Sequence, residues 1–394
     1  VLAVFGIFWL IRRQTYGILA ATVWIFLAHS IGLIFLLGFD YEFLNLAVFR
    51  PYPLVSYGML AFWMGCGFCL AWDKIRPWVK DGKPVFKLIP LFGLLIPIFL
   101  LQKNLNANDR RHDHFAENNA RMILGGLEPD AVLFVYGDSE TGPLGYFHFA
   151  EGVRPDIKLL SMQGLVYPNR ILSPLISEGR KKTVIESFLR DTQKPVYFMT
   201  SENDFPNTFG NIHFGFYKKM NRRGNSSSIQ LRFDKGVENY FKTLVEGPKP
   251  KDRWNRHRHN KLMHKFGDFL GYTLLSEDPK LNNRAGGLVK AMENQYYGLT
   301  GMAEILIQHG NSNHLKTAQE WLAKADSLMD ETLSKERLGR HHYLRGFLAY
   351  RIGNREQAIK QFRSSLKVYK HPENPSRNAL QRLNVKASEG GDSS

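Results

Sequence analysis

The sequence contains little cysteine and is poor in acidic side chains. Two of its 394 residues are cysteines, Cys66 and Cys69, and they stand one helical turn apart within one apolar run. A redox pair can have such spacing. Two small residues in a lipid-embedded helix have it as well, and we favour this second interpretation. The rest of the chain has no cysteine with which to form a disulfide.

Acidic residues number 36 against 52 lysines and arginines, which leaves a net charge of +16. Such an excess admits nucleic acid, an anionic membrane surface or an acidic ligand as a partner. The mean hydropathy of −0.27 conceals an uneven distribution. The apolar residues are concentrated in the first hundred positions, so this part of the chain needs a separate interpretation.

Three apolar runs in the first part are of membrane-spanning length, namely residues 16–38, 54–72 and 86–102. The opening run, residues 1–11, is only part of a span. We therefore expect residues 1–103 to form transmembrane helices. The chain begins at Val1 without a basic flank, unlike a signal peptide, and we expect the natural protein to extend upstream.

Basic residues predict which ends of these helices face the cytoplasm. Arg12 and Arg13 follow the opening run, and five lysines and arginines lie between residues 74 and 87. Both places are expected on the cytoplasmic side, which puts the chain beyond about residue 104 outside the cytoplasm. Membrane lipids are therefore expected partners, whereas nucleic acid is not.

Residues 104–235 have the pattern of a small α/β domain. The runs 131–136, 157–162 and 195–200 are apolar enough for strands buried on both faces. Helical segments are expected to include residues 121–124, 143–150, 169–178 and 183–190. This alternation predicts a parallel, doubly wound sheet. Residues 211–219 and 228–233 are candidates for further strands on either side of a polar turn.

Residues 236–385 change to a helical period, with Leu262, Phe266, Phe269 and Leu270 on one apolar stripe. Residues 339–372 fit the template of a tetratricopeptide unit, and residues 295–330 fit it if three residues are inserted after Gly310. The matching residues are Ala303, Gly310, Ala318, Leu322 and Ala325 in the first copy, and Gly346, Gly353, Ala358, Phe362 and Ser365 in the second. We expect these repeats to bind a protein partner or acceptor. Residues 386–394 are expected to be a disordered tail.

Polar residues follow three of the predicted strands, where parallel sheets bind ligands. They are Asp138, Ser139, Glu140, Thr141, Gln163, Glu202 and Asp204. A polar cluster that binds acceptor, sugar or metal is one interpretation. We favour a positioning turn, in which Gly137 adopts a strained backbone conformation and Asp138 or Thr141 caps a helix opened by Pro143.

The same turn allows two further interpretations. We expect Glu151 and Arg154 to form an ion pair at the return of this helix. The stretch FVYGDSET is also similar to the nucleophile block of GDS-type esterases, which would make Ser139 a nucleophile with Gly164 and Asn203 in an oxyanion hole. That family supplies its base in a D-x-x-H motif, and no such motif follows Asp204.

A basic run at residues 253–265 contains candidate contacts for a lipid headgroup or a phosphate. The residues are Arg253, Arg256, Arg258 and Lys261. A solvated helix face is the alternative interpretation. Three histidines lie in the same run, but no carboxylate or cysteine completes a metal site with them, so no metal is expected.

A longer stretch carries a second resemblance. The segment 123–161, with Gly137, Asp138, Glu140 and Thr141 followed by the motif E-G-V-R-P-D, resembles the region after the last span in a family of polytopic membrane proteins. Residues 50–68 resemble a late span of that family. Its eukaryotic members are protein O-mannosyltransferases of the endoplasmic reticulum, and its bacterial members commonly end in tetratricopeptide repeats.

This resemblance implies an integral-membrane glycosyltransferase that takes a sugar from a polyprenyl phosphate, in a bacterial inner membrane with its C-terminal domains in the periplasm. The family's catalytic carboxylate lies in the first external loop, and this chain begins after that point, so no catalytic residue is assigned. A non-catalytic membrane subunit that docks partner proteins is the alternative. The expected fold is a membrane α-helical segment, a small α/β domain and a C-terminal α-helical, tetratricopeptide-like region.

Overall fold

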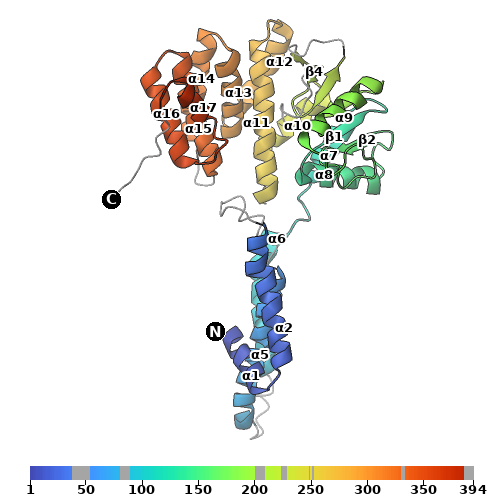
Figure 1. Ribbon diagram of the computed structural model, residues 1–394, viewed down its shortest axis with the longest axis vertical. Helices are drawn as coiled ribbons and strands as arrows, with labels where there is room; N and C mark the ends of the chain where they lie inside the picture. Colours follow the sequence, from blue (N-terminus) through green and yellow to red (C-terminus); the bar gives the residue numbers. More distant parts are fainter. Residues whose placement is uncertain are drawn as a thin grey trace. The chain divides into compact units, whose positions relative to one another are not determined.

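The computed structural model divides the chain into two compact units, Val1–His112 and Asp113–Ser394 (Figure 1). The structure describes residues 1–37, 54–79, 89–199, 209–222, 229–247, 249–250, 253–329 and 333–385. The predicted tail at residues 386–394 lies outside the described residues. The two units are described separately below.

The first unit consists of helices. They are α1 (Leu2–Arg12), α2 (Tyr16–Leu27), the π-helix η1 (Ala28–Gly32), α3 (Leu33–Leu37), α5 (Leu54–Val79) and α6 (Ile89–Asn108). In the described part of the chain, two stretches are long and apolar enough to cross a membrane, Tyr16–Leu36 and Leu54–Pro77. They match two of the predicted spans. The first three residues of the third predicted span, 86–102, lie outside the described residues, and the rest is within α6.

Helices α1 and α5 touch through glycine. A Cβ on Gly6 would clash with the carbonyl oxygen of Trp63, and a Cβ on Gly67 would clash with that of Leu2. Small residues of this kind allow membrane helices to approach closely. At the other end of α1, Trp9 Nε1 donates to Asp73 Oδ2 over 3.2 Å. Because Arg13 also pairs with Asp73, the C-terminal ends of α1 and α5 lie together.

The second unit contains a six-stranded sheet in the order β2-β1-β3-β5-β4-β6. Strand β1 (Val132–Val135) pairs in parallel with β2 (Lys158–Ser161) and with β3 (Val196–Phe198). Strand β5 (Lys218–Asn221) runs antiparallel to β3 and to β4 (Gly210–His213), and β6 (Ile229–Leu231) runs parallel to β4. The sheet is therefore mixed, because β5 runs opposite to β1, β2, β3, β4 and β6, and the prediction of a parallel sheet fails for that one strand.

A tight turn explains why the sheet is mixed. Residues 211–219, predicted as one strand, divide into β4 and β5, because Phe214 N–H donates to the carbonyl oxygen of Tyr217 over 3.1 Å. Gly215 has a φ of +102°, which suits a glycine in such a turn. A parallel pair needs a long crossover, so two strands joined this closely run antiparallel.

Both faces of β1 are buried, as its unbroken apolar run predicts. Val132 and Phe134 pack with Phe198, and with Ile185 and Leu189 of α9 (Glu178–Asp191). Leu133 and Val135 face the other core, which includes residues of α7 (Phe115–Gly125), α8 (Asp138–Gly145) and α10 (Lys235–Glu246). The helix predicted at 169–178 is wrong, because residues 169–177 form turns and bends.

Helix α11 (Arg253–Leu275) stands between the sheet and the helices α13 to α17 (Figure 1). Its predicted stripe is confirmed, since Phe266, Phe269 and Leu270 are completely buried and Leu262 nearly so. On its other side α11 meets α13 through glycine, because a Cβ on Gly267 would lie 2.5 Å from the carbonyl oxygen of Gly298.

The C-terminal helices are α12 (Pro279–Met292), α13 (Tyr296–His309), α14 (Ser312–Ser327), α15 (Lys335–Arg351), α16 (Arg355–Val368) and α17 (Ser376–Arg382). Helix α13 packs on α14, and α15 packs on α16. Side chains of Asn311, Ser334 and Asn354 accept hydrogen bonds from the first-turn N–H groups of α14, α15 and α16. The template positions of the two predicted repeats that lie within helices are buried. These are Ala303, Ala318, Leu322, Ala325, Gly346, Ala358, Phe362 and Ser365.

Candidate functional site

The loop after β1 begins with a strained glycine. Gly137 has a φ of +82°, in the region where L side chains are disfavoured, and this agrees with its predicted role. Helix α8 starts at the next residue, so Pro143 lies inside the helix and not in its first turn. The carbonyl oxygen of Gly137 accepts hydrogen bonds from the N–H groups of Glu140 (3.1 Å) and Thr141 (2.9 Å).

The predicted capping role of Asp138 or Thr141 is wrong. No side chain caps α8, because its N-cap residue is Gly137, which has none. Asp138 and Ser139 are exposed on the first turn. Within the described residues, Ser139 makes no hydrogen bond to a histidine, and Asn203 lies outside them.

Glu140 and Thr141 point into the protein instead. Glu140 is 7% exposed and Thr141 is 2% exposed. Tyr167 Oη donates to the Thr141 carbonyl oxygen over 2.7 Å, which ties the first turn of α8 to the loop after β2. The Thr141 hydroxyl is buried with no hydrogen-bond partner. A carboxylate and a hydroxyl are thus held just beyond the carboxyl end of β1.

Lys265 of α11 reaches the carboxyl end of the neighbouring strand. Its Nζ donates to the carbonyl oxygen of Met199, the residue after β3, over 3.1 Å. In the sheet order β2-β1-β3-β5-β4-β6, the strand that follows β1 in the chain lies to one side of β1. The strands that follow β3 lie on the opposite side of the sheet. The gap between β1 and β3 is therefore the point where the direction of the connections reverses, and ligands of α/β sheets bind at such points.

Arg258 lies two turns before Lys265 on the same face of α11. Its side chain is 8% exposed, and its guanidinium lies 5.8 Å from the centre of the Phe115 ring. It makes no hydrogen bond or ion pair with any residue that the structure describes. Burial lowers the pKa of the Arg258 guanidinium, and the nearby Glu140 carboxylate opposes this effect.

Other charges surround the same place. Burial likewise lowers the pKa of Lys265, and the charges of Lys261 and Lys218 lower it further. The carboxylates of Glu140 and Asp268 raise it. Lys218 starts β5 opposite Phe198 at the end of β3 and is buried. We call Arg258, Lys261, Lys265 and Lys218, together with Glu140, the cationic cluster. Burial, Lys218 and Lys265 hold the pKa of neighbouring His213 well below its usual value.

Two more buried oxygen atoms without partners lie on helices next to Arg258. They are Asn119 Oδ1 on α7, one turn after Phe115, and the Tyr240 hydroxyl on α10, which is close enough to Arg258 to influence its pKa. Buried polar groups normally have partners. The hydroxyls of Tyr240 and Thr141 and the Arg258 guanidinium can all donate to an anion with several oxygens, whereas Asn119 Oδ1 is an acceptor and cannot.

The structure thus brings together three of the predicted site residues, Glu140, Arg258 and Lys261. Arg256 is exposed and donates through Nε to the Pro250 carbonyl oxygen, and Gln163 is exposed after the edge strand β2. Arg253 is the first residue of α11, and its side chain is not described. Glu202 and Asp204 lie outside the described residues.

Sequence reasoning missed Lys265 and Lys218. Lys265 was part of the basic run, and its spacing of seven residues from Arg258 was the signal that both share one helix face. Lys218 carried no such signal, because a lysine at the start of a strand is usually solvated.

The motif E-G-V-R-P-D has a structural role in this chain. Arg154 donates from Nη1 to the carbonyl oxygens of Leu124 (2.8 Å) and Leu127 (2.9 Å), at the end of α7. It also pairs with Asp156 over 2.9 Å, so the predicted ion pair with Glu151 is wrong. Glu151 instead accepts a hydrogen bond from the hydroxyl of Tyr146.

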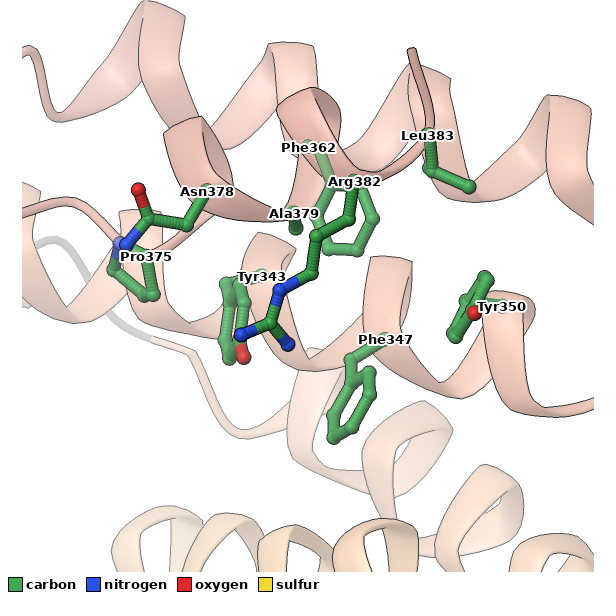
Figure 2. Close-up of a pocket in the computed structure, with 9 residues that line it drawn as sticks. All are labelled: Tyr343, Phe347, Tyr350, Phe362, Pro375, Asn378, Ala379, Arg382 and Leu383. Atoms are coloured by element: carbon green, nitrogen blue, oxygen red, sulfur yellow. The ribbon is translucent and has the colours of Figure 1, made fainter. Parts of the chain in front are cut away.

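A second concave site lies among α15, α16 and α17, where Figure 2 shows nine residues around a cavity of about 260 Å³. Tyr343, Phe347 and Tyr350 form a row on α15 with nearly parallel rings, at 20° and 14° between successive planes. Arg382 of α17 extends over this row in the same view. We call this the aromatic groove. Its lining suits an apolar side chain with a negative charge nearby.

Two curated proteins are similar to parts of the chain. The protein O-mannosyl-transferase tmem260 of Dictyostelium discoideum is 26% identical over 154 residues, which cover 34% of this chain and 19% of that protein. The protein O-mannosyl-transferase TMEM260 of Mus musculus is 29% identical over 77 residues, which cover 20% of this chain and 11% of that protein.

The aligned regions are thus less than a fifth of the length of either relative. No protein-family model matches the chain, and no solved structure matches it. Over a limited part of its length, the chain is similar to protein O-mannosyl-transferases.

Proposed function

We propose that this chain is the C-terminal part of an integral-membrane glycosyltransferase that transfers a sugar, most simply mannose, from a polyprenyl phosphate to protein. The observation that carries the proposal is the similarity to two protein O-mannosyl-transferases, found in a chain with two helices of membrane-spanning length. The similarity supports a glycosyltransferase-like function, and the lipid-linked donor is part of the proposal.

The proposal includes an orientation, with the α/β and C-terminal helical regions outside the cytoplasm, in the periplasm of a bacterium. It rests on the basic residues at the ends of α1 and α5. Arg13 pairs with Asp73 over 3.1 Å, so these two ends lie side by side, and the proposal puts both on the cytoplasmic side. A reporter enzyme fused after residue 250 should be active only in its extracytoplasmic form. Activity of the cytoplasmic form would contradict the orientation.

Transferase activity can be measured with the chain in membrane vesicles. The vesicles receive radiolabelled polyprenyl-phosphate mannose and a peptide rich in serine and threonine. Because the resemblance places the catalytic carboxylate upstream of Val1, the chain is produced together with the sequence encoded upstream of it. Label should then appear in the peptide above the level of vesicles from the same host without the chain. If this protein is folded and no label is transferred, the transferase proposal is contradicted. Further spans with an acidic external loop, encoded upstream of Val1, would assign catalysis to that part.

A non-catalytic scaffold is the second candidate, and the aromatic groove favours it. The helix pairs α13/α14 and α15/α16, with their buried small residues, support tetratricopeptide-like repeats at 295–330 and 339–372. Repeats of this kind present concave surfaces to partner proteins. Phe347→Ala, with exposed Lys316→Ala on α14 as control, should weaken retention of a membrane partner while mannose transfer is unaffected. An unchanged complex would contradict docking in the groove.

A further inference from the structure

Arg258 is in an unusual position for an arginine. The residue is only 8% exposed, yet its side chain has no hydrogen bond or ion pair in the described part of the chain. Buried charges are normally paired because the loss of their hydration is unfavourable. Phe115 stacks near the guanidinium and supplies a weak attraction, but its ring does not replace hydrogen-bond acceptors.

The charges around Arg258 do not balance. The carboxylates near these cations are those of Glu140 and Asp268, and the four cations Arg258, Lys261, Lys265 and Lys218 outnumber them by two. Lys218 of β5 lies near enough to lower the pKa of Lys265. An added dianion would restore neutrality. A carboxylate ligand would supply one negative charge and two oxygens, whereas a phosphate supplies two charges and more oxygens.

Donors suited to phosphate oxygens are present at the same place. An arginine offers a planar fork of N–H groups, and a lysine offers a compact charge. The Thr141 hydroxyl, one residue from Glu140, and the Tyr240 hydroxyl on α10 are buried without partners, and both can donate. The position is also the expected one, since the groups lie beyond the carboxyl ends of β1 and β3, where the connections reverse.

We propose that Arg258 and Lys265 of α11, with the Thr141 hydroxyl of α8, form a binding site for a phosphate group. When the site is empty, the Glu140 carboxylate partly neutralises the positive charges of Arg258 and Lys265. The ligand is a phosphate monoester or free phosphate, carried either by a lipid or by a soluble molecule. The site does not depend on the transferase proposal, because phosphate binding is measured without any sugar transfer.

The test uses the complete chain in nanodiscs of zwitterionic lipid, titrated calorimetrically with inorganic phosphate at low ionic strength. Arg258→Met and Lys265→Met should each raise Kd at least tenfold. Arg258→Lys should have an intermediate Kd, because lysine keeps the positive charge but lacks the planar set of N–H donors. Glu140→Gln should lower Kd severalfold, since the competing carboxylate is removed. A purely structural Glu140 would not give tighter binding on its removal.

Arg256→Met is the matched control. Arg256 lies on the same helix, about 160° around the helix axis from Arg258, and it is exposed. Its Kd should equal that of the unchanged protein. The proposal is overturned if the unchanged chain binds no phosphate, if folded Arg258→Met binds as well as the parent, or if Arg256→Met weakens binding equally. Thermal unfolding of each variant shows whether it is folded.

Polyprenyl phosphate incorporated in the nanodiscs distinguishes the source of the ligand. If polyprenyl phosphate abolishes the binding of inorganic phosphate, and if this competition requires Arg258, the ligand is a lipid-linked phosphate. An unchanged titration identifies a soluble phosphate or phosphoester. Either result supports the site, and the sugar-transfer assay then tests the glycosyltransferase proposal separately.

Discussion

Replacing Arg258 with methionine should stabilise the protein in phosphate-free buffer. Methionine retains an unbranched apolar stem that can pack over Phe115, and it removes a charge that is buried without a partner. Burying unpaired polar or charged groups costs several kcal/mol, and part of this is offset here by attraction to Glu140. We expect a net gain of about 1–3 kcal/mol.

Thermal unfolding of the complete chain, followed by circular dichroism, measures this change. Because 1 kcal/mol corresponds to about 2–4 °C in a domain of this size, the midpoint should rise by roughly 2–12 °C. Arg256→Met, an exposed substitution, should leave the free energy of unfolding within about 0.5 kcal/mol of the parent.

Phosphate should reverse the order of stability. A ligand at a thousand times its Kd stabilises the folded state by about 4.1 kcal/mol, and only the protein with Arg258 should gain this. The reasoning is refuted if Arg258→Met is destabilised by more than about 1 kcal/mol without phosphate. That result would make Arg258 a structural counter-ion of Glu140, whose removal leaves a buried carboxylate.

Three further substitutions test other parts of the structure. Gly6→Ala should separate α1 from α5 and lower the thermal stability of the membrane unit in detergent, whereas Gly17→Ala, which has open space, should not. Gly137→Ala should cost about 1–3 kcal/mol in urea unfolding through backbone strain alone, because no atom obstructs the added methyl group; an unchanged midpoint would refute this. Burial, followed by the charges of Arg337 and Arg340, lowers the pKa of His264 to about 4, although the Glu304 carboxylate opposes this shift. The unfolded chain takes up this proton below pH ~6.5 and the folded chain only below ~4, so stability should fall by up to about 3 kcal/mol as pH decreases through this interval. Urea unfolding of His264→Gln should show a weaker pH dependence, and an identical dependence would contradict the assignment.

Much of the local structure was predictable because it depends on short-range patterns. The unbroken apolar run of β1 predicted a strand buried on both faces, and the spacing of Phe266, Phe269 and Leu270 predicted one face of α11. The strain at Gly137 followed from a glycine placed between a strand and a helix.

Long-range arrangement was not predictable in the same way. Glu140 and Arg258 were each candidates, but nothing in the sequence indicated that they share one site. Their proximity depends on which sheet face α11 covers and on the order of β1 and β3. The start of α8 was missed because proline usually marks a first turn. Here the helix begins five residues before Pro143 and continues into the π-helix η3 (Tyr146–Ala150).

The glycine contact between α11 and α13 has a mechanical consequence. Gly267 touches the backbone of Gly298, and a Cβ on Gly301 would clash with the carbonyl oxygen of His264, so no side chain separates the two helices there. Arg258 and Lys265 project from the opposite face of α11. Backbones in direct contact cannot slide past each other without breaking that fit. A displacement of α11 along its own axis would therefore have to carry α13 with it, because the two backbones interlock at these glycines.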